Sequence, residues 1–172
     1  MGDSKTFELK TLGKDSIQKS LDKAHRYRLL NEPLHCESIC LDVLAIEPEN
    51  QQAINILLLA LTDQFDQRLT ERYRKALEIK DQLTDPYRRV YYDGLICERR
   101  GLALYKRGGP GAGYVTYDWL RQAMEFYDAA RQLSPEGNDD AILRWNTCAR
   151  IIMRNPEIQP EPAETGVRFL DV

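Results

Sequence analysis

The chain has 172 residues, of which 30% are charged and 42% are hydrophobic. This balance is typical of a globular protein and argues against a globally disordered or fibrous chain. The formal net charge of −3 excludes a strong overall positive field, so nucleic-acid binding would need a local basic patch.

The four cysteines have no regular spacing, and no secretory signal precedes them, which favours a reduced, cytoplasmic protein over a disulfide-bonded one. The longest apolar run, Ala53 to Leu61, has nine residues and is interrupted by Asn55. A membrane-spanning helix needs about 20 apolar residues, so this run is expected in a protein core. We therefore expect no association with membranes.

Apolar residues recur at a spacing of three or four from Ile17 to Arg154, which predicts an all-α fold. Proline is accepted in the first turn of a helix and pushes the residue before it out of the helical region, so prolines mark boundaries. Four prolines do so here: Pro33, Pro48, Pro86 and Pro135. The pattern predicts seven helices, at residues 17–30, 33–46, 50–65, 69–83, 87–106, 116–133 and 138–154.

Three regions differ in composition. Residues 1–15 have weak periodicity and are expected to form a flexible lead, whereas residues 16–154 form the helical domain. Residues 155–172 contain three prolines and are expected to form an extended tail. The tail carries an apolar tip from Val167 to Val172, which suggests self-association or occupation of a groove.

Residues at regular intervals reveal an internal repeat. When a helical unit of about 34 residues is placed so that it ends near Pro48, small and apolar residues fall at its packing positions. These residues are Ala24, Tyr27, Cys36, Cys40 and Val43. Aligned on Pro135, the stretch AMEFYDAARQLSP places Ala123, Tyr127 and Ala130 in the same way. These motifs resemble the tetratricopeptide repeat.

The resemblance covers residues 17–154. It implies antiparallel helical hairpins stacked as a short right-handed solenoid of about three repeats plus a capping helix, because one hairpin cannot bury its apolar face alone. The middle unit departs from the pattern in its second helix. The third is lengthened by an insertion that includes the glycine-rich stretch from Gly108 to Gly113, whose role the sequence leaves open.

In tetratricopeptide arrays, the first helix of each repeat lines a concave groove, and the resemblance therefore implies a groove that binds peptides. The expected groove residues are His25, Arg28, Asn55, Leu59, Arg88, Tyr91, Tyr92, Glu98 and Arg99. Tyrosine and arginine are enriched at binding hot spots. We expect a non-catalytic module, without cofactor or metal, that binds an extended acidic and apolar segment as an adaptor, chaperone or assembly factor.

One subtype of this family is not supported. Domains that clamp the C-terminal carboxylate of chaperones resemble one another in carrying Lys and Asn at two positions of the first repeat. This chain has Leu21 and His25 at those positions.

Two alternatives remain open from the residues alone. Cys36 and Cys40 lie four residues apart, so with His35 they could bind zinc or supply a reactive thiol, although a structural zinc site needs four ligands and no further motif supplies them. An arginine-rich stretch could bind RNA by charge pairing and stacking. Its basic residues are Arg88, Arg89, Arg99 and Arg100.

The glycine-rich stretch GGPGAG could in principle hold a phosphate group. A phosphate-binding P-loop requires Lys followed by Ser or Thr directly after the last glycine. Tyr114 and Val115 stand there instead, so we expect a loop between two helices.

Overall fold

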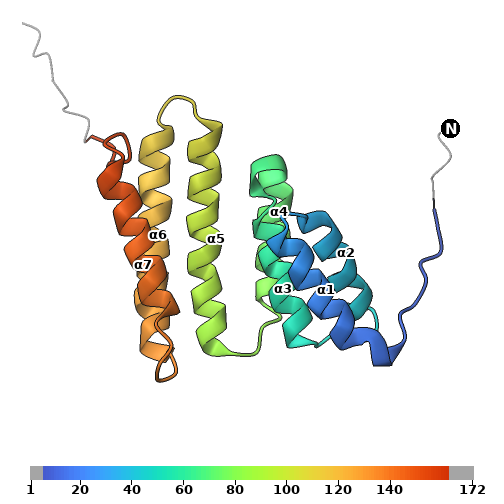
Figure 1. Cartoon of the computed structure of the whole chain (residues 1–172). Helices are drawn as coiled ribbons and strands as arrows, with labels where there is room; N and C mark the ends of the chain where they lie inside the picture. The colour runs from blue at the N-terminus through green and yellow to red at the C-terminus, as the bar shows by residue number, and fades with distance from the viewer. Residues whose placement is uncertain (1–5, 163–172) are drawn as a thin grey trace, which may run out of the picture.

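The computed structural model describes residues 6–162. This part of the chain contains no strand and is built from helices, which confirms the predicted all-α class. The helices in chain order are η1 (Lys14–Ser16), α1 (Ile17–Leu29), α2 (Pro33–Leu44), α3 (Gln51–Thr62), α4 (Phe65–Lys80), α5 (Pro86–Arg107), α6 (Ala112–Leu133) and α7 (Asp140–Arg154). Figure 1 shows α5, α6 and α7 side by side at one end and α1 to α4 grouped at the other.

Local chemistry explains where several helices begin. Pro33 and Pro86 stand in the first turns of α2 and α5, where a backbone N–H would have no partner within the helix. Asn50 caps α3, because its Oδ1 accepts a hydrogen bond from the backbone N–H of Ala53 at 2.9 Å. Asp85 caps α5 in the same way, through the N–H of Tyr87 at 2.9 Å.

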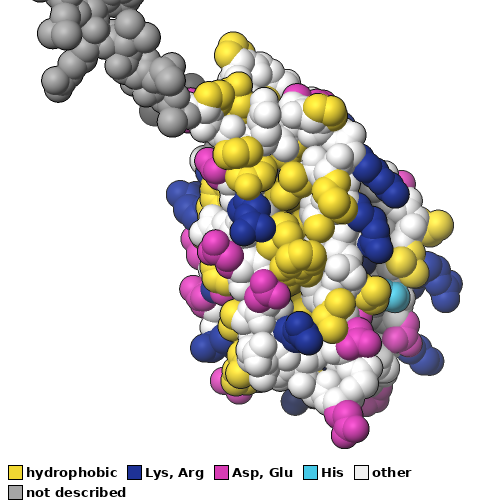
Figure 2. All heavy atoms as spheres, turned by 90° about the vertical axis from the view of Figure 1, so that its left-hand side faces the viewer, with side chains coloured by type: hydrophobic (Ala, Val, Ile, Leu, Met, Phe, Trp, Pro, Cys, Tyr) yellow, Lys and Arg dark blue, Asp and Glu magenta, His cyan; other side chains and the backbone are white. Residues whose placement is uncertain are grey.

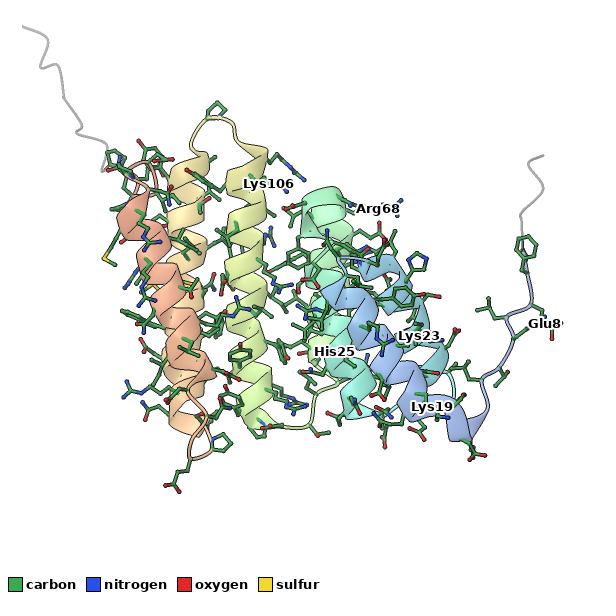
Figure 3. All side chains as sticks on the ribbon, in the orientation of Figure 1. Glu8, Lys19, Lys23, His25, Arg68 and Lys106 are labelled. Atoms are coloured by element: carbon green, nitrogen blue, oxygen red, sulfur yellow. The ribbon has the colours of Figure 1, made fainter. Side chains whose placement is uncertain are left out.

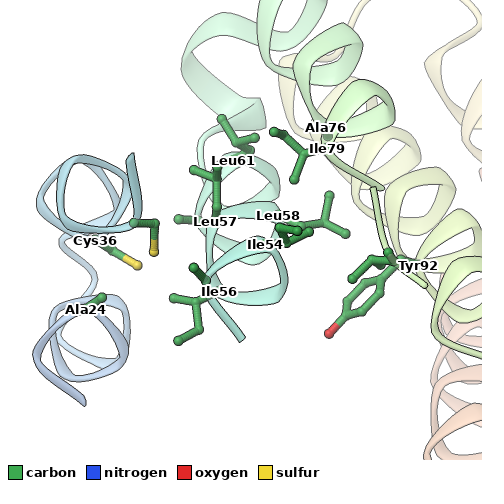
Figure 4. Packing of buried hydrophobic residues seen from close by; sticks show 14 of the residues in the cluster. Ala24, Cys36, Ile54, Ile56, Leu57, Leu58, Leu61, Ala76, Ile79 and Tyr92 are labelled. Atoms are coloured by element: carbon green, nitrogen blue, oxygen red, sulfur yellow. The ribbon is translucent and has the colours of Figure 1, made fainter. Parts of the chain in front are cut away.

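Helix α3 forms the centre of the first hydrophobic cluster. Eight of its twelve residues are buried, and it packs against both α2 and α4. Figure 4 shows its apolar side chains between Cys36 of α2 on one side and Tyr92 of α5 on the other. The helices pack as neighbours in sequence, and α1 additionally contacts α3.

Helix α5 lies between two hydrophobic clusters. Its residues Tyr92 and Leu95 belong to the cluster around α3, whereas Cys97 packs with residues of α6 and α7. Arg100 of α5 also contacts both sides. Its guanidinium group lies 3.8 Å from the ring centre of Tyr73 in α4 and 4.5 Å from that of Trp119 in α6. This long helix therefore joins the two halves of the molecule.

The turn between α5 and α6 is shorter than the sequence suggests. It occupies residues 108–111, and α6 begins at Ala112 rather than near residue 116. Gly108, Gly109 and Gly111 adopt positive φ angles there, which glycine permits. Gly113 lies inside the first turn of α6, where the backbone oxygen of Glu157 occupies the space that a Cβ atom would need.

The start of the predicted tail is packed against the domain. After α7, the backbone N–H of Ile158 donates a hydrogen bond to the carbonyl of Asn155 at 2.9 Å. Only 2% of Ile158 is exposed, and it joins the cluster of α6 and α7. The apolar tip from Val167 to Val172 lies outside the described residues. No helix between residues 6 and 162 is long and apolar enough to cross a bilayer.

We predict that Gly94→Ala destabilises the protein by about 1–3 kcal/mol, because overpacking a core costs that much. An added Cβ would lie 2.7 Å from the ring of Tyr127, a side chain that is 1% exposed and hydrogen-bonded to Glu98. Urea unfolding measures the change. The matched control is Gly13→Ala, which meets no atom within 4 Å; equal stability of the two variants would contradict the packing.

Candidate functional site

One carboxylate connects three helices at the surface. Asp63, which follows α3, forms an ion pair with Arg28 of α1 at 2.8 Å through its Oδ2 atom. Its Oδ1 atom accepts a hydrogen bond from Arg99 of α5, and Arg99 also donates to Thr62 Oγ1 at 2.7 Å. These side chains are about 20% exposed. The C-terminal ends of α1 and α3 and the middle of α5 therefore lie together at one surface.

We call this surface the α1–α3–α5 face and define it by residues that lie along it: His25, Arg28, Asn55, Leu59, Asp63, Arg88, Tyr91 and Arg99. On α3, Asn55, Leu59 and Asp63 follow at intervals of four and therefore share one side. On α5, Arg88, Tyr91 and Arg99 follow a similar stripe. His25 is exposed on α1 and is labelled in Figure 3.

Asn55 and Leu59 are half-buried at the middle of this face. Asn55 is a hydrogen-bond partner of the Tyr92 hydroxyl, and burial raises the pKa of Tyr92. The Oδ1 atom of Asn55 is buried and has no partner among the described residues. An unpaired buried acceptor is costly, so this amide has unused capacity for a hydrogen bond.

Two of the predicted groove residues belong to the core. Tyr92 is 7% exposed and Glu98 is 3% exposed. The Glu98 carboxylate accepts a hydrogen bond from Tyr127 Oη at 2.6 Å and from Arg144 of α7 at 3.0 Å. A charge buried this deeply requires such partners. Tyr92 and Glu98 thus stabilise the fold, whereas Arg28, Arg88, Arg99 and His25 reach the surface.

Tyr91 lies at the centre of an aromatic group on α5. Its ring stacks on Tyr87 at 5.7 Å between centroids and contacts Tyr92 at 5.3 Å and Tyr127 at 5.7 Å. Tyr91 is also a hydrogen-bond partner of Arg144. The group holds a half-buried tyrosine in a fixed orientation at the surface, and a pre-oriented aromatic side chain loses little entropy on binding.

Asp63 stands at a groove position of the repeat pattern but was not among the selected site residues, and Arg144 was missing altogether. Asp63 could have been found, because it occupies the same helical stripe as Asn55 and Leu59. Arg144 could not, because it reaches Glu98 from 46 positions along the chain. The face and its margin carry four arginines, Arg28, Arg88, Arg99 and Arg144, which outnumber the carboxylates beside them. These arginines exceed the carboxylates Asp63, Asp85 and Glu98 by one, so the local excess is a single positive charge.

The cysteines and histidine of the metal hypothesis do not come together. Cys36 and Cys40 are fully buried in the first cluster, whereas His35 is mostly exposed, pairs with Glu32 and stacks on Tyr27. Within residues 6–162, no three His, Cys, Asp or Glu side chains are arranged to hold a metal ion. The hydrogen bond with Cys40 lowers the pKa of Cys36, and the same bond, together with burial, raises the pKa of Cys40.

The arginines of the RNA hypothesis are mostly engaged within the protein. Arg89 donates hydrogen bonds to the carbonyls of Leu83 and Asp81 at the end of α4. Arg100 stacks between two aromatic rings, and Arg99 pairs with Asp63. Arg88 is exposed and lies 3.7 Å from Asp85. The four arginines do not form a continuous basic patch.

Comparison with known proteins found no match among family models, curated proteins or solved structures. The resemblance to the tetratricopeptide repeat therefore remains a prediction from the sequence.

We predict that unfolding becomes easier as the pH rises from 9 to 12. Burial raises the pKa of Cys97 and of Cys148 from 9.0 to about 12, so the folded protein keeps two protons that the unfolded chain has lost in this window. Stabilisation by the two thiols is complete below pH 9 and disappears as the pH passes 12. Denaturant unfolding at several pH values measures the slope.

The variant Cys97→Ala/Cys148→Ala controls for tyrosines and lysines that titrate in the same window. Its free energy of unfolding should fall less steeply with pH than that of the parent protein. Equal slopes would contradict burial of these thiols. In addition, a thiol reagent at pH 8 should modify none of the four cysteines until the protein unfolds, because all four are buried.

Proposed function

We propose that the protein is a non-catalytic binding module that takes an extended segment of a partner protein on the α1–α3–α5 face. The observation that carries this proposal is the joining of three helices by Asp63, which aligns arginine, asparagine and tyrosine side chains along one surface. Side chains of these types combine contact area with hydrogen bonding, as binding hot spots do.

We further propose that the helices are three hairpins and a cap in a tetratricopeptide-like, right-handed solenoid. Packing of sequence neighbours, with an added contact between α1 and α3, is the pattern expected when the first helices of successive hairpins lie next to each other. In this arrangement α1, α3 and α5 would line the concave side.

All four cysteines are unpaired and buried, in keeping with the reduced, cytoplasmic setting expected from the sequence.

The charge of the face favours a partner with acidic residues. Arg28 and Arg99 share the single carboxylate of Asp63, so their guanidinium groups retain donors for a second carboxylate. Leu59 and Tyr91 offer apolar area between these charges. We therefore propose an extended peptide with alternating acidic and apolar residues, presented by a protein that this module delivers, protects or helps to assemble.

Selection from a random peptide library on the immobilised full chain tests this proposal. The selected peptides should be enriched in Asp, Glu and apolar residues. The variant His25→Ala/Arg88→Ala should bind them about tenfold more weakly, because a hydrogen bond to a charged group contributes about 1.5–3 kcal/mol. Both side chains are exposed, so the fold should be unchanged. Calorimetry or fluorescence anisotropy measures the affinity.

The matched control is Lys23→Ala/Arg107→Ala, which also removes two exposed basic side chains but leaves the α1–α3–α5 face intact. It should bind the selected peptides with unchanged affinity. Equal losses of affinity in both variants would mean that binding depends on overall charge and not on the α1–α3–α5 face. Selection of basic peptides, or of none, would reject the proposed ligand.

A further inference from the structure

Helix α7 has an apolar side that the described residues leave uncovered. It packs on α6, yet only Ala141 and Cys148 among its fifteen residues are buried. Leu143 is 62% exposed and Met153 is 75% exposed. Figure 2 views this end of the molecule and shows hydrophobic side chains gathered across its surface, with basic and acidic groups around them. Such a patch on a monomer generally marks a contact surface.

The partly exposed side forms a mainly apolar stripe in which Met153 is exposed and the other residues are half-buried. Ile142, Asn146, Ala149 and Met153 follow at intervals of three and four, which places them on one side of α7 over about 17 Å. A hollow of about 240 Å³ lies next to this stripe, between α6 and α7. Its lining residues are Tyr127, Asp128, Arg131, Ala141, Ile142, Trp145 and Asn146. We call the stripe and the hollow together the α7 groove.

The described chain ends near the C-terminal end of α7 (Figure 1). After α7 it turns back, is anchored by the buried Ile158, and is described as far as Pro162. Figure 1 shows this end of the described chain at the same end of the molecule as the last turn of α7. Met153, the last residue of the stripe, lies only two residues before the turn at Asn155.

We propose that residues 163–172 bind in the α7 groove of their own chain. Ten residues reach up to about 33 Å when extended, whereas a helix of the length of α7 spans about 22 Å. The segment can therefore run the whole stripe. Its apolar side chains Val167, Phe169 and Leu170 would cover the stripe, and tethering gives them an effective concentration near the millimolar range.

Charge also favours this occupant over a second copy of the chain. Arg150 and Arg154 flank the stripe, and Arg131 lines the hollow. The segment brings two carboxylates to them, Glu164 and Asp171, together with one arginine, Arg168, for which Asp128 of the hollow is a possible partner. Two copies of α7 packed face to face would instead bring arginine against arginine, which is unfavourable. The segment would then cover the last helix of the array and leave the α1–α3–α5 face open.

A photo-crosslinking experiment on the full chain tests this inference. Phe169 is replaced by benzoylphenylalanine, which keeps an aromatic apolar side chain, and the cross-linked peptides are mapped by mass spectrometry. We expect intramolecular cross-links to residues 142–153. Cross-links to α1, α3 or α5, cross-links between two chains, or no cross-link would each overturn the proposal; the first would place the segment on the α1–α3–α5 face and the second would indicate self-association.

Adding Met153→Glu to the photoreactive chain should reduce the cross-link yield at least fivefold without loss of helicity, because Met153 is largely exposed. Leu30→Glu is the matched control, since Leu30 is 65% exposed at the far end of the molecule, where α1 ends. It should leave the yield unchanged. Equal yields in the two variants would place the segment elsewhere. These readouts do not depend on whether the α1–α3–α5 face binds a peptide.

Discussion

Burial of α3 is the constraint on which the rest of the structure depends. This helix is apolar around most of its circumference, so it must be covered on several sides at once. The pair α1 and α2 covers one side, and α4 with α5 covers the other. One polar residue directly after this helix, Asp63, then pairs with arginines from the helices on either side. Hydrophobic burial thus positions the α1–α3–α5 face, and one shared carboxylate completes it.

The helices themselves could be predicted because their signals are local. Prolines and capping residues mark the starts of α2, α3 and α5, and the observed starts of these three helices agree closely with the expected ones. The break between α3 and α4 was misplaced. Gln64 is buried there and donates hydrogen bonds to Glu37 and to the carbonyl of Ala60, so the chain enters α4 at Phe65. A glutamine at this position gives no local sign of such a contact.

The start of α6 could not be predicted from local sequence either. Glycine-rich sequence suggested a loop up to residue 115, yet Gly113 lies in α6, and a distant backbone oxygen, that of Glu157, leaves no room there for a Cβ atom. Among the expected groove residues, which came from the repeat resemblance, Arg28 and Arg99 both pair with Asp63. The resemblance could not show that Glu98 is buried, because its partner Arg144 comes from the last helix. Local periodicity therefore predicts elements and stripes, whereas burial depends on contacts between distant residues.

Hydrogen exchange of the full chain, with and without a saturating acidic and apolar peptide, tests most directly whether the α1–α3–α5 face is the binding surface. Our account predicts that the peptide slows amide exchange in α1, α3 and α5 and leaves α2, α4 and α6 unchanged. Protection concentrated in α2, α4 or α6, or confined to α7, would contradict it.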